Sequence, residues 1–213
     1  MLVLYGHPFS SYTWKALIAL YDRAIPFKFR SMEEEGSGPV VIAASPLGKF
    51  PLLVDGDEQV FEATAIIEWL AATRTEGAGL IPSDPREAVR ARMADRVFDN
   101  YVMNVTTECV VEAIRTGALS DATRADVGGR LERSYRWIEE WLSRRADPGR
   151  ITLVECAAAP SLFYADWVHR IPDDCPRLKA WRAHLLVLPA VSRCVEDARP
   201  FRHYFPLGAP DRD

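Results

Sequence analysis

The N-terminal third of the chain alternates strand-like and helix-like patterns of apolar residues. Residues 2–5 form a short apolar run, and residues 26–30 alternate apolar and polar positions with a period of two, so both segments are predicted strands. Between them, residues 11–23 carry bulky side chains at the i, i+3, i+4, i+7 spacing of an amphipathic helix. These bulky residues are Trp14, Leu17, Ile18 and Tyr21.

The pattern continues to residue 73 and predicts a small α/β domain. A short apolar piece at residues 40–44 follows an acidic, glycine-rich loop, and two apolar runs flank the hairpin sequence DGDE at residues 55–58. A further helical stripe covers residues 62–73. The predicted order is β-α-β-α-β-β-α, in which a right-handed crossover joins a parallel strand pair and the hairpin is antiparallel. A mixed four-stranded sheet packed against helices is the simplest arrangement.

The strand signals stop at a segment rich in glycine and proline, residues 77–86. Such a segment interrupts periodic structure and is typical of a connection between domains. We therefore place the α/β domain at residues 1–76, a linker at residues 77–86 and an all-helical domain at residues 87–213.

Two long helical stripes and three shorter helices make up the predicted second domain. The long stripes cover residues 86–116 and 121–145. Thr152, followed three positions later by Glu155, has the capping-box pattern, in which each side chain satisfies an unpaired backbone amide. Proline suits the first turn of a helix. The shorter helices are predicted to begin at Thr152, Pro176 and Pro189.

The composition favours a soluble, cytoplasmic protein. With 48% apolar residues the chain can build a full core, and a net charge of −4 without a polybasic run argues against a nucleic-acid partner. No apolar stretch approaches the ~20 residues of a membrane span, and no signal-peptide pattern is visible. Four scattered cysteines without CxxC spacing encode neither a metal site nor a local redox dithiol and suit a reducing compartment. They are Cys109, Cys156, Cys175 and Cys194.

Three segments of the first domain are predicted to converge. FSSYTWK, residues 9–15, connects the first strand to the first helix, SPLGKFP, residues 45–51, leads into the hairpin, and FEATAIIEWL, residues 61–70, begins the next helix. Helix N-termini present unpaired amides and a partial positive charge, so both helix starts favour anions. The three segments therefore predict a site for a ligand with more than one negative group.

These segments resemble those of cytosolic glutathione transferases of a bacterial, zeta-like serine type. FSSYTWKALIAL is similar to the zeta-type signature, SPLGKFP to the family's Asn-Pro-x-x-x-Val-Pro segment, and EATAIIEWL to its Glu/Gln-Ser-x-Ala-Ile-x-x-Tyr-Leu segment. ITLVECAAAPSLFYA, residues 151–165, is similar to the capping motif of the helical domain. The resemblance spans nearly the whole chain, and it implies a thioredoxin-like N-terminal domain followed by an all-helical domain.

Carried over residue by residue, the resemblance implies a glutathione site. Ser10 matches the serine whose hydroxyl hydrogen-bonds the glutathione sulfur and favours the thiolate. Phe50 matches the residue whose backbone pairs with the cysteinyl part of glutathione, and Pro51 matches the family's cis-proline. Lys49 lies where a side chain can approach the glycyl carboxylate, and Glu62 matches the residue that faces the γ-glutamyl ammonium.

One departure from the resemblance bears directly on glutathione binding. Residue 63 matches the partner that holds the γ-glutamyl carboxylate, and it is Ala63 where the family has serine. The helix-terminal amide remains, but a hydrogen bond to a charged group, worth roughly 1.5–3 kcal/mol, is lost. We predict that glutathione binding is weaker by about tenfold or more unless another donor substitutes. Thr64 points about 100° around the helix and is a poor replacement.

Several candidate residues have an alternative, structural interpretation. Ser10 and Ser11 both suit the N-cap of the first helix, and we assign Ser11 as a cap or a secondary glutathione contact. Tyr12 is a rival partner for the sulfur and a candidate for the acceptor-substrate pocket. Tyr101 and Val105 are further candidates for that pocket, although their helical stripe equally fits core packing.

The resemblance implies a glutathione transferase that activates the thiol of its co-substrate for attack on small hydrophobic electrophiles. A free thiol has a pKa near 8.5, and lowering it by about 2 units needs only ~2.7 kcal/mol, which a hydroxyl donor and a helix N-terminus can supply. This chemistry requires neither a metal nor a protein nucleophile. The resemblance also implies a homodimer. The aromatic tail at residues 201–205 fits either a cover over the site or packing on the helical domain.

Three other functions stay open at this point. The first is a glutathione-dependent isomerase that resembles maleylacetoacetate isomerase. The second is a non-catalytic ligand-binding protein on the same fold, which Ala63 favours. The third is a thiol-disulfide oxidoreductase, which needs a cysteine where this chain has Ser10.

Overall fold

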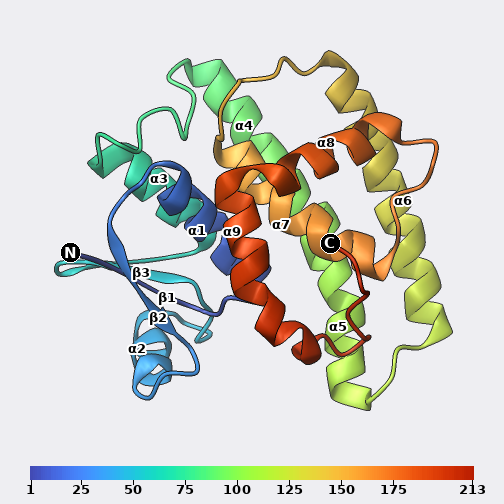
Figure 1. Ribbon diagram of the computed structural model, residues 1–213, viewed down its shortest axis with the longest axis horizontal. Helices are drawn as coiled ribbons and strands as arrows, with labels where there is room; N and C mark the ends of the chain where they lie inside the picture. The colour runs from blue at the N-terminus through green and yellow to red at the C-terminus, as the bar shows by residue number, and fades with distance from the viewer.

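A four-stranded sheet with three helices forms the N-terminal part of the chain, and helices alone form the rest, in a computed structural model that describes all 213 residues (Figure 1). The observed order is the predicted β-α-β-α-β-β-α. The elements of the first part are β1 (Leu2–Gly6), α1 (Ser11–Asp22), β2 (Phe27–Ser31), α2 (Ser37–Ala44), β3 (Leu52–Asp55), β4 (Glu58–Phe61) and α3 (Ala63–Thr73).

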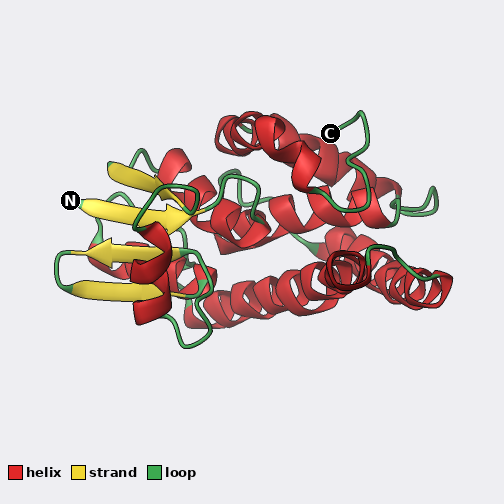
Figure 2. Cartoon of the chain, turned by 90° about the horizontal axis from the view of Figure 1, so that it is seen from below, coloured by secondary structure: helices red, strands yellow, loops and turns green.

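The sheet is mixed and has the strand order β2-β1-β3-β4. β1 and β2 are parallel, with Leu2 opposite Phe27, whereas β3 is antiparallel to both β1 and β4. Figure 2 shows the four strands at one end of the molecule and the helical part extending away from them. This topology confirms the predicted thioredoxin-like α/β fold, and it places the start of α1 at the end of β1 that faces the helical part.

The second part consists of six α-helices, one π-helical segment and one 3₁₀ segment. The prolines at the starts of α8 and α9 and the capping box at Thr152 are where the sequence predicts them. The elements are α4 (Pro85–Val97), η1 (Phe98–Met103, π-helical), α5 (Asn104–Thr116), α6 (Asp121–Arg144), α7 (Leu153–Val168), α8 (Pro176–Val187), α9 (Pro189–Ala198) and η2 (Arg199–Tyr204, 3₁₀).

The long helix predicted over residues 86–116 is instead three consecutive segments, α4, η1 and α5. It begins within the predicted linker, because Asp84 caps it by accepting hydrogen bonds from the amides of Arg86 and Glu87, and Pro85 occupies the first helical position. The π-helical segment η1 then interrupts the regular α-helical hydrogen bonding between α4 and α5.

The apolar stripe of that predicted helix mostly faces outward. Three of its five residues, Val89, Met93 and Tyr101, are 63%, 49% and 60% exposed, and only Val97 and Val105 are buried. A step of four residues advances about 400° around a helix, so a strict four-residue stripe rotates away from one face. Small residues form most of the buried face of α4, and they are Ala88, Ala91 and Ala94.

α1 is the central helix of the molecule. Trp14 and Ile18 are fully buried, and the helix packs against α3 on one side and against α7 and α9 on the other. The first domain therefore shares one continuous hydrophobic core with the helical part. No helix combines the length and the apolar character that crossing a membrane requires.

Candidate functional site

The first helix start at the predicted site is capped by Ser10. The Ser10 backbone is extended (φ −94°, ψ 123°), and its Oγ accepts a hydrogen bond from the Thr13 amide at 3.3 Å. The Ser10 amide in turn donates to the carbonyl of His7 at 3.0 Å. The hydroxyl acts as an acceptor towards Thr13, so its own hydrogen is left to donate to a further group.

Two buried aromatic residues hold the turn that precedes Ser10. The indole Nε1 of Trp14 donates to the carbonyl of Pro8 at 2.6 Å, and the hydroxyl of Tyr164 on α7 donates to the carbonyl of Phe9 at 2.9 Å. Gly6 is also constrained, because a Cβ added there would lie 2.6 Å from the Thr13 side chain. The position of Ser10 is thus fixed from both parts of the molecule.

The second helix start has a different geometry. Glu62, the N-cap residue of α3, has a φ of 71°, and its side chain makes no capping hydrogen bond. Positive φ is unfavourable for a residue with a Cβ and is found most often at functional sites. Ala63 is the first residue of α3, so the first amides of this helix have no side-chain acceptor and are available to an anion.

A cavity of about 190 Å³ lies between this helix start and the helical part. It brings together six of the residues that the sequence analysis singles out. The Phe50–Pro51 peptide bond beside it is cis. The lining residues are Tyr12, Lys49, Phe50, Pro51, Glu62, Ala63, Arg96, Asp99, Asn100 and Asn104.

The other predicted residues do not line this cavity. Ser10 precedes Tyr12 by two positions and is half-buried, and Ser11 is the first residue of α1 and makes no side-chain hydrogen bond. The cap is therefore Ser10 rather than Ser11. Tyr101 and Val105 line a separate groove of about 620 Å³ formed by α4, η1, α5 and α6, which shares only Asn100 with the cavity.

Tyr12 is held by the helical part. Its hydroxyl donates to Oδ1 of Asn104 at 2.7 Å. Burial, followed by the charge of Asp99, raises the pKa of Tyr12 above its usual value. Tyr12 therefore stays protonated at neutral pH, and its one hydrogen is already donated to Asn104. This arrangement favours Ser10 over Tyr12 as a donor to a ligand sulfur.

A buried charge cluster that sequence reasoning missed lies beside the cavity. Lys15 on α1 is 1% exposed, and its Nζ lies 2.6 Å from Oδ1 of Asp95 and 2.8 Å from Oδ2 of Asp99. The Thr64 hydroxyl accepts from Lys15 at 3.0 Å and donates to Oδ2 of Asp95 at 3.0 Å. This polar cluster, Lys15–Thr64–Asp95–Asp99, joins α1, α3, α4 and η1.

Arg96 connects the polar cluster to the cavity. Its Nη2 donates to Oδ2 of Asp99 at 2.9 Å and also bonds Asp95 and the Thr64 hydroxyl. Burial raises the pKa of Asp99, and the charge of Lys15 opposes this rise. One sequence signal could have located the cluster: a spacing of four residues puts Asp95 and Asp99 on one helix face, next to the buried alanines.

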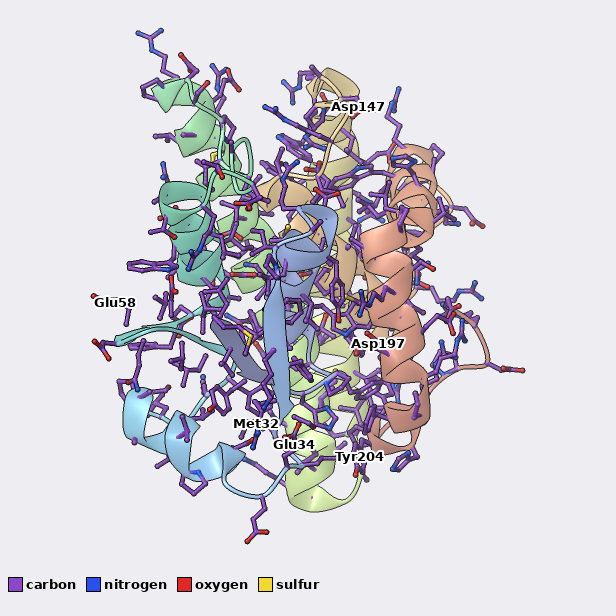
Figure 3. The ribbon with its side chains drawn as sticks, turned by 60° about the vertical axis from the view of Figure 1, so that its left-hand side comes forward. Met32, Glu34, Glu58, Asp147, Asp197 and Tyr204 are labelled. Atoms are coloured by element: carbon purple, nitrogen blue, oxygen red, sulfur yellow. The ribbon has the colours of Figure 1, made fainter.

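The aromatic tail packs across the boundary between the two parts of the molecule. The edge of Phe201 contacts the ring of His7, with centroids 4.8 Å apart, and the Tyr204 hydroxyl donates to Oε1 of Glu33 at 2.8 Å. Figure 3 shows Tyr204 beside Met32 and Glu34, in the loop that follows β2. The tail therefore covers the turn that leads to Ser10, in addition to packing on the helical part through Phe205.

Two family models match the chain. Residues 4–77 match the N-terminal domain of glutathione S-transferase, and residues 121–184 match its C-terminal domain. The matched ranges agree with the division of the structure into a sheet-containing part and a helical part. Together they cover more than half of the 213 residues.

Individual proteins agree with the family models. A glutathione S-transferase of Silene vulgaris is 27% identical over 203 residues, which cover 88% of this chain and 93% of the relative. FzlA from C. crescentus has a TM-score of 0.81 at 24% identity and covers 99% of this chain and 96% of its own. A glutathione S-transferase of Methylobacillus flagellatus, solved with GSH bound, has a TM-score of 0.78 at 23% identity, covering 91% and 98%. At these identities the two structures establish the fold.

Proposed function

The chain belongs to the glutathione S-transferase family, and we propose that it is a serine-type transferase in which Ser10 activates the glutathione thiol. The observation that carries the proposal is the cavity in which the uncapped start of α3 meets the Phe50–cis-Pro51 segment, close to the capped start of α1. The curated relatives named glutathione S-transferase support the reaction class. The zeta-like assignment rests on the motif FSSYTWK.

In this proposal, glutathione lies across the two helix starts. Its γ-glutamyl end occupies the cavity at Glu62 and Ala63, its cysteinyl part pairs with the backbone of Phe50, and its glycyl carboxylate approaches Lys49. The cavity alone is smaller than the ~300–1,000 Å³ of typical ligand pockets. The sulfur therefore lies outside it, towards Ser10.

The Ser10 hydroxyl donates to the sulfur while its oxygen accepts from the Thr13 amide. The donor and the N-terminus of α1 both favour the thiolate over the thiol, which lowers the thiol pKa towards neutrality. The thiolate then attacks the electrophilic carbon of a small hydrophobic acceptor. A carbon–sulfur bond forms, and the leaving group departs with the electron pair of the bond that breaks. Tyr12 lines the glutathione cavity and keeps its hydrogen on Asn104, so Ser10 remains the donor to the sulfur in this proposal.

The test is conjugation of glutathione to an aromatic electrophile such as chlorodinitrobenzene. Because a charge-assisted hydrogen bond is worth roughly 1.5–3 kcal/mol, we expect Ser10→Ala to lower kcat/KM at pH 7 by about ten- to a hundredfold. The loss should shrink above about pH 9, where an unassisted thiol ionises anyway. Wild-type activity in Ser10→Ala at pH 7 would exclude Ser10 as the thiol partner.

A homodimer and a cytoplasmic location are also part of the proposal. The groove that contains Tyr101 and Val105 is bordered by Met93 and Trp137, which are 49% and 44% exposed, and a second copy of the chain would cover these apolar side chains. The four cysteines are free and buried, which suits a reducing compartment.

Sedimentation velocity tests the homodimer. We expect a wild-type dimer that Trp137→Glu dissociates and that Val187→Glu, at a 73% exposed position on α8, does not. A monomeric wild type would contradict the dimer and would leave the exposed Tyr101 accessible to an acceptor substrate.

A further inference from the structure

Ala63 lacks the hydroxyl that serine would present to the cavity, but the guanidinium group of Arg96 lines the same cavity. Arg96 and Ala63 line one cavity although they lie on α4 and α3, and Nη2 of Arg96 hydrogen-bonds the hydroxyl of Thr64, the residue that follows Ala63. The guanidinium therefore lies beside the first turn of α3, where the uncapped amides are.

The polar cluster holds this guanidinium in place without using all of its donors. Nε and Nη2 of Arg96 bond Asp95, and Nη2 also bonds Asp99 and Thr64. Both carboxylates are buried, so this edge of the group is fixed. Nη1 makes no hydrogen bond within the chain, and Arg96 is half exposed. Two N–H donors of Nη1 thus remain for a ligand in the cavity.

The cavity also presents an opposite charge. Glu62 lines it, its carboxylate contributes to the electrostatic field at Arg96, and the two side chains form no ion pair with each other. Asp99 also lines the cavity, but it is paired with both Lys15 and Arg96. The unpaired carboxylate of Glu62 and the free Nη1 of Arg96 complement a zwitterionic α-amino acid group, which carries an ammonium and a carboxylate on a single carbon.

We infer that Arg96 binds the α-carboxylate of the γ-glutamyl residue of glutathione and replaces the hydroxyl donor that Ala63 lacks. This inference rests on the proposed function, since it concerns the same site. It also changes the expectation from the sequence: the alanine is compensated from the helical part, so glutathione affinity is not weakened by the full loss of a charge-assisted hydrogen bond. The chain then recognises this end of glutathione with both of its domains.

The experiment compares two ligands by isothermal titration calorimetry. One is glutathione, and the other is γ-aminobutyryl-cysteinyl-glycine, which lacks only the α-carboxylate. We expect Arg96→Gln to weaken glutathione binding by about ten- to a hundredfold and to change binding of the analogue by less than about threefold. Arg96→Lys keeps the charge but not the fork of donors, so its loss should be intermediate. Arg96→Gln with Ala63→Ser should recover part of the glutathione affinity.

Arg92→Gln is the matched control. Arg92 lies one turn earlier on α4 and pairs with Glu68 of α3 at 2.6 Å, but it does not line the cavity. Its substitution should leave both affinities unchanged. Equal losses for the two ligands in Arg96→Gln, or unchanged glutathione binding, would overturn the role of Arg96 while leaving the proposed function intact. A wild type that binds neither ligand would overturn both.

Discussion

α1 and α3 both begin at the proposed glutathione site, yet their first turns are built differently. At α1, the extended Ser10 caps the helix with its own oxygen and fits its backbone without strain. At α3, Glu62 has a φ of 71° and caps nothing, so the helix start is uncapped and strained. Strain of this kind costs about 1–3 kcal/mol per residue. At the start of α1, the Ser10 cap stabilises the fold, and its hydroxyl hydrogen is still free to donate. At the start of α3, the first backbone amides stay free for a ligand, and the strained backbone lowers the stability of the fold.

The polar cluster connects these two helix starts. Lys15 lies five residues after Ser10, Thr64 lies two residues after Glu62, and Asp95 accepts hydrogen bonds from both side chains. Any movement of one start relative to the other must therefore break buried, charged hydrogen bonds. We infer that the cluster sets the distance between the α3 start, where we propose that the γ-glutamyl end binds, and the α1 start, where we propose that the thiol is activated.

The largest effect is expected from Lys15→Met, which removes the link between the two starts. It leaves Asp95 and Asp99 buried with only the half-exposed Arg96 as a cationic partner. Removing one partner of a buried pair costs roughly 3–5 kcal/mol, so the free energy of unfolding in urea should fall by that amount. Lys28→Met, at an exposed position on β2, is the control and should change it by less than about 0.5 kcal/mol. A loss below 1 kcal/mol for Lys15→Met would mean that the cluster does not tie the starts together.

The next largest effect is expected from Glu62→Gly, and its sign is opposite for stability and binding. Glycine adopts positive φ without a steric cost, so the strain is relieved at a smaller entropic cost, and the unfolding free energy should rise by about 1 kcal/mol. Glutathione affinity should fall by about tenfold or more, because the carboxylate proposed to face the ammonium of glutathione is removed.

Ala24→Gly separates these two effects of Glu62→Gly. Ala24 is the other residue with a Cβ and a positive φ, at 50°, and it lies beyond the end of α1, away from the cavity. The unfolding free energy of Ala24→Gly in urea should rise by a similar amount. Its affinity for glutathione, measured by calorimetry, should stay at the wild-type value. A loss of stability in Glu62→Gly would show that the α3 start is not strained.

The contrast between the two starts also explains what the sequence could predict. Hydrophobic periodicity and turn residues predicted α1, α3 and the hairpin, and prolines and the capping box predicted the starts of α7, α8 and α9. Each of these signals lies within a few residues of sequence. The polar cluster joins residues 80 and 84 positions apart, and periodicity carries no information about such pairs. Lys15 follows the buried Trp14 in an amphipathic helix and would be expected at the solvated face. Its burial, and with it the place of Arg96, depends on how the two domains pack.

Ser10→Ala is expected to change stability less than Lys15→Met does, although it should lower kcat/KM strongly. The Thr13 amide loses its acceptor, and loss of an N-cap costs about 1 kcal/mol, so Ser10→Ala should lower the urea unfolding free energy by that amount. Ser10→Gly should cost only a few tenths of a kcal/mol and yet lose as much activity as alanine. If activity followed stability across the two variants, the hydroxyl would act as a cap alone.

The smallest effect is expected from Ser11→Ala, which tests whether the two adjacent serines are equivalent. Ser11 is already inside α1, and its side chain makes no hydrogen bond within the chain. Alanine has the higher helix propensity, so the unfolding free energy should change by less than about 0.5 kcal/mol. The pH profile of kcat/KM should match that of the wild type, because Ser10, the proposed donor to the sulfur, is still present. A shift of that profile as large as the one in Ser10→Ala would assign the thiol contact to the first residue of the helix and leave Ser10 with the cap.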